Sequence, residues 1–315
     1  MKKLLALLLT LITCFSLGCE KDDAPTPSPS PTPIGSTPLL YKVTDTDGDF
    51  IWLFGSIHVG RVDYYPLPDY VMNALENSDA LAVEADIISF EKDVSAQTEA
   101  LSQLLYSDGT TIEEHIDEQL YLDAVEILDE IGYTTLYDYY CPSLWTNLID
   151  NILYEKLKID GELGVDRHLL KYAKKNDIKI YEIESAEFQY GMLANFSPEL
   201  QEILLKESVQ NFAKPEKAKK ELNELIDLWY KGDEKALIEA VKPDFTDVTE
   251  EEIALADEYV TKMLTDRNMG MTDFAVDALE KGEEIFICVG TAHVIGEDSI
   301  TDLLKEKGYK VEIVK

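Results

Sequence analysis

Residues 50–59 have the sequence Phe-Ile-Trp-Leu-Phe-Gly-Ser-Ile-His-Val, and residues 285–294 have the sequence Ile-Phe-Ile-Cys-Val-Gly-Thr-Ala-His-Val. Each stretch begins with a short apolar run, which is typical of a buried β-strand, and continues into Gly-x-x-His-Val. The two motifs therefore place His58 and His293 just beyond the ends of two strands. Because open α/β sheets build their sites beyond the carboxyl ends of strands, this repeat indicates both a fold and a site.

The segments around the two motifs predict the rest of a sheet. Apolar residues 39–43 and 50–54 are separated by Asp47-Gly48-Asp49, which indicates a β-hairpin. Further strands are predicted at residues 80–84, 178–183, 284–289 and 310–314. Each motif is followed by a predicted helix and a predicted strand. The sequence thus predicts an α/β fold with a central mixed sheet, built from two pseudo-symmetric strand–Gly-x-x-His–helix–strand halves.

A large helical insertion is expected between the two halves. Over residues of about 88–281, apolar positions recur mostly at helical spacing, interrupted by the strand near residues 178–183. Ser197-Pro198 is typical of a helix start, because proline is favoured at the first helical position.

The first 18 residues predict a secretory signal peptide. Lys2 and Lys3 form a short basic region, and an apolar stretch leads to Gly18-Cys19. Cys19 resembles the acceptor of a bacterial lipoprotein, although Ser16 stands where a leucine is usual. The alternative is a plain signal peptide that is cut nearby.

Residues 19–38 are rich in Pro, Ser and Thr, a composition that favours an extended tether over a packed core. A tether directly after a lipid-carrying cysteine suits a domain that is anchored at a membrane surface. We therefore expect an extracytoplasmic lipoprotein whose folded domain spans residues 39–315, with contact to the membrane through the lipid on Cys19.

The chain is strongly acidic, with 62 acidic and 28 basic residues and a formal net charge of −34. Nucleic acid is not an expected partner, because binding its phosphates needs a basic face. Cationic ligands and divalent metal ions are compatible with this charge. Cys288 lies within a predicted buried strand and is expected to be a core residue.

Four predicted strands end at candidate site residues: His58, Glu84, Glu184 and His293. If the strands are parallel in one sheet, these side chains converge at one edge. Asp86 is an alternative to Glu84, and Glu182 is an alternative to Glu184. The other two histidines, His115 and His168, lie in charged helical stretches and are expected at the surface.

Two histidines and a glutamate are a common ligand set for a catalytic divalent metal ion. We therefore expect His58, Glu84 and His293 to be the metal ligands; a histidine acting as general base without metal is the alternative. Arg267 is a further candidate, because a guanidinium can bind a carbonyl or carboxylate oxygen or clamp an active-site glutamate. A surface salt bridge is the alternative for Arg267.

Several motifs together resemble those of the TraB/PrgY/GumN family, to which the Tiki proteins also belong. The resemblance rests on the first Gly-x-x-His with its trailing Tyr-Pro-Leu-Pro, and on Ala82-Val83-Glu84, Gly164-Val165-Asp166, Ile183-Glu184-Ser185, Arg267-Asn268 and Val289-Gly290-Thr291-Ala292-His293. It implies an α/β fold related to erythromycin esterase and ChaN-like proteins. It also implies a metal-dependent hydrolase centred on His58, Glu84 and His293, with Arg267 in support.

Three functional hypotheses follow. The first is a metallopeptidase-like hydrolase that acts on extracytoplasmic peptides, because the Tiki proteins resemble metalloproteases. The second is a non-catalytic surface lipoprotein that binds or sequesters a secreted, pheromone-like peptide, because PrgY-type members are linked to shutting down peptide pheromones. The third is an inert scaffold in which both motifs serve packing alone.

Overall fold

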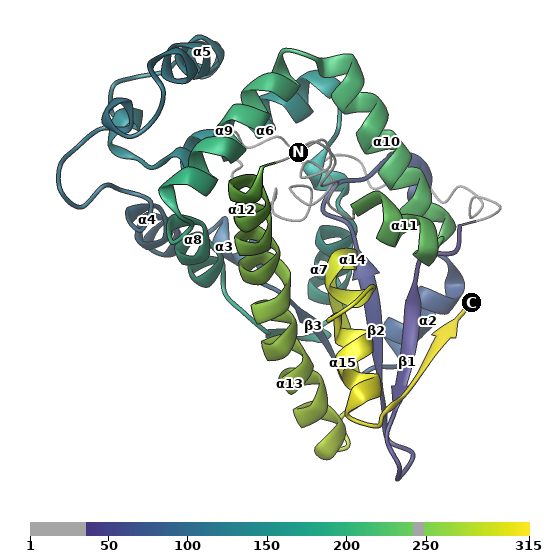
Figure 1. Ribbon diagram of the computed structural model, residues 1–315. Coiled ribbons are helices and arrows are strands. Elements are labelled where there is room, and N and C mark those ends of the chain that lie inside the picture. The colour runs from purple at the N-terminus through teal and green to yellow at the C-terminus, as the bar shows by residue number, and fades with distance from the viewer. Residues whose placement is uncertain (1–35, 242–248) are drawn as a thin grey trace.

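The computed structural model describes residues 36–241 and 249–315 (Figure 1). The expected signal peptide, Cys19 and the tether up to residue 35 lie outside the described residues. At the start of the described chain, the Thr37 N–H donates to the Tyr230 carbonyl at 2.9 Å, and the Thr37 hydroxyl donates to the Lys231 carbonyl at 2.7 Å. Within these two ranges, none of the helices combines the length and the apolar character needed to cross a bilayer.

A six-stranded mixed sheet forms the centre of the molecule, with the strand order β4-β3-β5-β2-β1-β6. The strands are β1 (Leu40–Thr44), β2 (Phe50–Ser56), β3 (Ala80–Val83), β4 (Lys179–Glu182), β5 (Ile285–Gly290) and β6 (Lys310–Val314). Strands β4, β3, β5 and β2 are parallel, whereas β1 is antiparallel to both β2 and β6. The expected mixed α/β sheet, including the β1–β2 hairpin, is confirmed.

Most of the remaining chain is helical. The α-helices are α2 (Asp69–Glu76), α3 (Ile87–Phe90), α4 (Val94–Ser102), α5 (Glu118–Leu128), α6 (Pro142–Leu157), α7 (Val165–Lys175), α8 (Ala186–Ala194), α9 (Pro198–Phe212), α10 (Pro215–Lys231), α11 (Glu234–Val241), α12 (Glu250–Val260), α13 (Asp266–Glu280), α14 (Thr291–Val294) and α15 (Ile300–Glu306). Short 3-10 segments are η1 (Val62–Tyr64), η2 (Ile112–Glu114), η3 (Asp129–Ile131), η4 (Tyr137–Tyr139) and η5 (Gly161–Leu163), and η6 (Thr261–Thr265) is a π-helical segment. Ser197 caps α9, and Pro198 follows at its first position, as expected.

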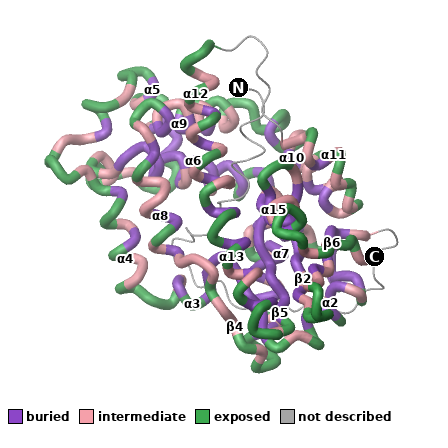
Figure 2. The backbone as a smooth tube through the Cα atoms, turned by 60° about the horizontal axis from the view of Figure 1, so that its bottom comes forward, coloured by how far each residue is buried: buried purple, intermediate pink, exposed green. Residues whose placement is uncertain are grey.

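The helices between β3 and β5 lie mainly beyond one end of the sheet. In Figure 1, α13 and α15 lie in front of the sheet and α2 and α7 behind it, while α6, α9 and α10 lie above its upper end. Buried residues are concentrated in the central strands and in the helices that cover them, with a second apolar cluster around α5, α6 and α8 (Figure 2). Helices therefore enclose the edge to which the parallel strands point.

The two Gly-x-x-His motifs lie on adjacent parallel strands but have different backbone conformations. Strands β2 and β5 pair so that Ser56 stands opposite Gly290. The first motif remains in the strand through Ser56, and His58 follows in a bend; the second leaves the strand at Gly290 and enters α14. The similar sequences thus deliver their histidines by different local structures.

Candidate functional site

Five predicted residues meet beyond the carboxyl ends of the parallel strands. His58 follows β2, Glu84 follows β3, Glu184 follows β4, and His293 lies in α14 directly after β5. Arg267 comes from α13 and inserts its guanidinium between the two glutamates. The structure therefore brings all five candidates together at the edge where the parallel strands end.

The central point of the site lies at Gly290. A Cβ atom placed on this glycine would lie 3.3 Å from Glu84 Oε1, 3.6 Å from His293 Cδ2 and 3.7 Å from His58 Nε2. The Gly290 N–H also donates to Glu84 Oε1 at 2.7 Å, and His293 Nε2 lies 3.9 Å from the same oxygen. Both imidazoles and one carboxylate thus surround a position that only glycine leaves open.

A fixed hydrogen-bond network sets the protonation of His293. Asn268 Nδ2 donates to the Asp298 carbonyl at 2.9 Å, so its Oδ1 atom faces His293 Nδ1 at 2.7 Å. Because the Asn268 oxygen can only accept, Nδ1 carries the hydrogen and Nε2 of the neutral ring presents a lone pair. Burial first, and then the charge of Arg267, lower the pKa of His293 to about 3, so the ring is neutral at pH 7.

The second histidine is oriented by a carboxylate. His58 Nδ1 lies 3.1 Å from Asp166 Oδ1, and both side chains are buried. Burial lowers the pKa of His58, but the Asp166 carboxylate outweighs it and raises the value to about 9. Among residues 36–241 and 249–315, neither ring nitrogen of His58 has a hydrogen-bond partner, and neither does His293 Nε2, so Asp166 contacts His58 as an ion pair.

Gly164 explains how Asp166 reaches His58. The Val165 N–H donates to the Ile57 carbonyl at 2.8 Å, which holds the start of α7 against the first motif. A Cβ on Gly164 would lie 2.5 Å from the His58 carbonyl oxygen, so no other residue fits there without moving the backbone. The Gly-Val-Asp motif therefore positions the carboxylate that orients His58.

Arg267 clamps the two glutamates. Its Nη2 atom lies 2.5 Å from Glu84 Oε2 and 2.8 Å from Glu184 Oε2, and its Nε atom donates to Glu184 Oε1 at 2.8 Å. Nη1 donates to the Met263 carbonyl, in the π-helical segment η6, at 3.2 Å. The amide of Gln189 donates to Glu84 at 3.2 Å and to Glu184 at 3.1 Å. Arg267 therefore clamps the glutamates of the site and does not form a surface salt bridge.

The clamp keeps Glu84 ionised although it is buried. Burial alone would raise the pKa of this carboxyl, but the charge of Arg267 and the two histidines outweigh it and lower the value to about 2. Removal from water is the main influence on Arg267 and lowers its pKa, yet the two carboxylates raise it overall. The site therefore contains a buried guanidinium shared by two carboxylates.

The two rival carboxylates face other partners. Asp86 accepts from Ser89 at the start of α3 and pairs with Lys174 at 2.6 Å. Glu182 is exposed and accepts from the Asp86 N–H. Glu84 and Glu184 are thus the carboxylates of the site.

The other two histidines, His115 and His168, were expected at the surface, and this prediction is confirmed for His115 alone. His115 is exposed and stacks on Tyr106. His168 is half-buried and stacks on Tyr65 with ring centroids 4.1 Å apart, so its assignment to the surface was wrong. Burial lowers the pKa of His168 to about 4, and the ring serves as a neutral packing group.

Three residues that contact the site were not predicted as site residues: Asp166, Gln189 and Asn268. Asp166 and Asn268 belong to motifs that the sequence displayed, next to Gly164 and Arg267, so a signal for them existed. Gln189 carried no such signal, because its place depends on how α8 packs against the ends of β3 and β4.

Comparison with known proteins finds similar bacterial proteins and a matching family. No solved structure matches it. It is 26% identical over 261 residues to the uncharacterized protein YbaP of Escherichia coli strain K12, which covers 80% of this chain and 87% of that protein. The YbaP protein of Shigella flexneri matches with the same identity and coverage. A model of the TraB/PrgY/gumN family matches residues 39–313, a range that contains every residue of the site. The chain therefore belongs to the TraB/PrgY/gumN family.

Proposed function

We propose that this chain is a metal-dependent hydrolase that cleaves peptides outside the cytoplasm, with a divalent cation held by His58, Glu84 and His293. The observation that carries the proposal is the surroundings of the two nitrogen atoms in each imidazole ring. The Nδ1 atom of His293 is hydrogen-bonded to Asn268, that of His58 lies 3.1 Å from Asp166 Oδ1, and both Nε2 atoms are without a hydrogen-bond partner within the described chain. Histidines that bind metal are oriented in this way by carboxylate or carbonyl oxygens.

The donor types fit a divalent metal, and the spacing is slightly wide. Two histidines and a glutamate form a known catalytic zinc set, in which ligands at ~2.1 Å from the ion stand roughly 3.4 Å apart. His293 Nε2 and Glu84 Oε1 are 3.9 Å apart. As the side chains stand in the described ranges, no group of three or more His, Cys, Asp or Glu is arranged to hold an ion. Binding would therefore draw these side chains together.

The pKa values disfavour metal-free general base catalysis, and a metal ion at His58 would have to displace the proton that its raised pKa holds at pH 7. An efficient general base has a pKa near the working pH. The pKa of His58 is about 9 and that of His293 is about 3, so neither ring exchanges protons readily near pH 7. A bound cation supplies a Lewis acid that lowers the pKa of a water molecule and polarises a carbonyl group.

The surrounding residues have positioning roles in this proposal. Asp166 and Asn268 orient the imidazoles, and Arg267 with Glu184 and Gln189 holds Glu84 in place. The proposal includes the fold relationship that the family resemblance implies, to erythromycin esterase and ChaN-like proteins. It also includes an extracytoplasmic location, with Cys19 as the lipid-bearing anchor and the Pro/Ser/Thr-rich segment as a tether.

Metal analysis of the full mature chain tests the proposal. We expect the purified protein to bind about one Zn²⁺ or Mn²⁺ per chain and to cleave members of a peptide library. Chelation should abolish cleavage, and adding the metal back should restore it. A His58→Ala, His293→Ala variant should bind no metal, whereas the exposed His115→Ala substitution should change nothing. Peptide cleavage that persists in the metal-free protein would contradict the metal assignment, and peptide binding without turnover would favour a sequestering protein.

Replacing Asn268 tests its positioning role. Asn268→Leu leaves the Nδ1–H of His293 without an acceptor and frees the ring to rotate. We expect the metal affinity to fall by about 10- to 100-fold, the usual effect of losing such a partner. Competition with a chromophoric chelator measures this affinity. Asn223→Leu is the matched control, because that amide donates to the Lys219 carbonyl within its own helix, α10; equal affinities in both variants would contradict the role of Asn268.

A further inference from the structure

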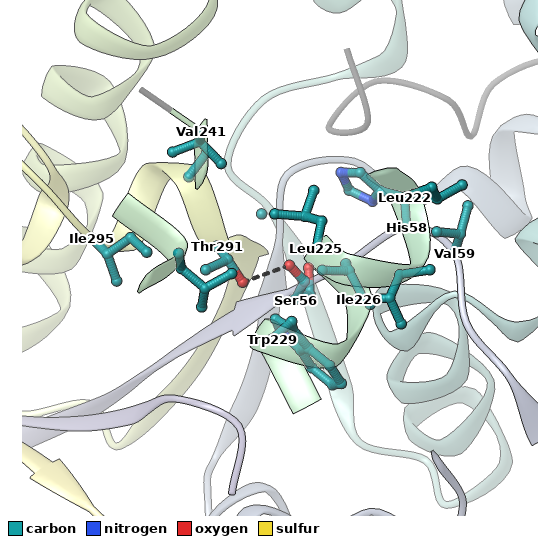
Figure 3. A pocket seen from close by; sticks show the side chains of 14 residues that line it. Ser56, His58, Val59, Leu222, Leu225, Ile226, Trp229, Val241, Thr291 and Ile295 are labelled. Atoms are coloured by element: carbon teal, nitrogen blue, oxygen red, sulfur yellow. Dashed lines mark hydrogen bonds between the residues drawn. The ribbon is translucent and has the colours of Figure 1, made fainter. Parts of the chain in front are cut away.

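An apolar pocket opens directly beside the site. It lies between the ends of β2 and β5 and helices α10 and α11, and Figure 3 shows Trp229, Ile226 and Leu225 on the side of α10. The pocket encloses about 570 Å³, counting the part that opens to solvent. Because this volume includes open solvent, it is an upper bound on the space that a ligand group can fill. It is lined by Ser56, Ile57, His58, Val59, Leu222, Leu225, Ile226, Trp229, Leu237, Val241, Gly290, Thr291, Ala292 and Ile295.

The lining contrasts with the composition of the chain. The protein has 62 acidic residues, yet none of the 14 lining residues is acidic, and His58 is the one titratable side chain among them. Two lining polar groups are already engaged, since Trp229 Nε1 donates to the Gly55 carbonyl and the Thr291 hydroxyl donates to the Ser56 carbonyl, each at 2.8 Å. A charged ligand group would lose its water here, and the one titratable lining side chain, His58, is already paired with Asp166 at 3.1 Å. The pocket thus suits an uncharged apolar group.

The pocket and the site share residues. His58 and Gly290 line the pocket, and the same two residues border the point where the imidazoles and Glu84 meet. A group that fills the pocket therefore lies next to the centre of the site. The hydrogen bond from Trp229 to Gly55 ties α10 to β2, which fixes the wall relative to the site.

We infer that this pocket binds an aliphatic or aromatic side chain of the peptide, at a residue that flanks the cleaved bond. This inference rests on the proposed peptide hydrolase function and names its substrate class. Burying a leucine side chain contributes about 1.5–3 kcal/mol, which corresponds to roughly 10- to 100-fold in affinity. We therefore expect peptides with Leu or Phe at this position to be preferred about 10- to 100-fold over those with Asp or Lys.

Two measurements on the mature protein test the pocket. The first is kcat/KM for blocked peptides that differ at one position, which carries Leu, Phe, Ala, Asp or Lys. The second is the binding of acetyl-Gly-Leu-Gly-amide and acetyl-Gly-Asp-Gly-amide to protein from which a chelator has removed the metal. Binding is measured by NMR of the peptide. Leu225→Trp fills the pocket and should remove the preference for Leu in both measurements. Leu225→Ala enlarges the pocket and should shift the preference toward Phe.

Leu228→Trp is the matched control, because Leu228 is also half-buried on α10 but does not line the pocket. It should keep the preference of the unmodified protein. Cleavage that shows no preference for apolar residues would overturn the pocket assignment and leave the hydrolase proposal intact. A preference in binding that Leu225→Trp removes, with no cleavage of any peptide, would support the pocket and refute the hydrolase. A preference that survives Leu225→Trp would also overturn the assignment.

Discussion

Gly290→Ala is expected to reduce kcat/KM for peptide cleavage by about 100-fold or more while the protein remains folded. The added methyl group would lie 3.3 Å from Glu84 Oε1 and 3.7 Å from His58 Nε2, in the space that the proposed ligands surround. The backbone at Gly290 has φ −52°, which alanine adopts without strain. We expect the free energy of unfolding to change by about 1 kcal/mol at most. Urea unfolding, metal affinity and cleavage rate together check this result.

The glycine of the first motif provides the matched comparison. A Cβ on Gly55 would lie 2.8 Å from Thr291 Oγ1 and 3.2 Å from Thr291 Cα, so β2 and α14 would have to separate. Gly55→Ala is therefore expected to lose about 1–3 kcal/mol of stability, as overpacked sites do. If both variants lost stability alone and kept the same residual activity, the scaffold hypothesis would gain support. Full activity in Gly290→Ala would refute the placement of the reacting centre at this glycine.

Much of this site follows from a property of parallel strands. His58, Glu84, Glu184 and His293 come directly after apolar runs, and side chains beyond the ends of parallel strands meet at one edge. The sequence was therefore sufficient to predict that residues more than two hundred positions apart lie together. Arg267 was predictable as a candidate only, because its role depends on the orientation of α13.

The remaining features depend on tertiary packing. The two motifs suggested equivalent turns, yet Gly55 lies inside β2 whereas Gly290 ends β5 and directly precedes α14. The pairing of Ser56 with Gly290 also offsets the two motifs by one residue. Which carboxylate of each pair reaches the site was also open. Asp86 is held by Lys174 and Glu182 accepts from the Asp86 backbone, contacts that join segments about 90 residues apart. His168 was misplaced because its burial depends on stacking against Tyr65.

Removing the guanidinium of Arg267, which Glu84 and Glu184 share, should have the largest effect on stability. Arg267→Met leaves the buried carboxylates of Glu84 and Glu184 close together, both hydrogen-bonded to the Gln189 amide. Breaking a buried ion pair in this way costs about 3–5 kcal/mol, because a buried charge loses its partner. We expect a loss of this size at pH 8, measured by urea unfolding. Arg267→Met, Glu184→Gln should recover part of it, because one of the two unpaired charges is gone.

The pH dependence of this loss separates charge from packing. Without Arg267, one of the two carboxyls should bind a proton in the folded state at a higher pH than in the unfolded state. The folded variant then holds more protons, so its stability should rise as the pH falls from 8 to 5, and the deficit should shrink. Arg167→Met is the control, because Arg167 is also buried but its partners Glu91 and Glu162 have side chains that are 20% and 50% exposed and can regain water. A deficit for Arg267→Met that equals the control, or that does not change with pH, would mean that Arg267 stabilises the site by packing and does not hold Glu84 as an ionised ligand.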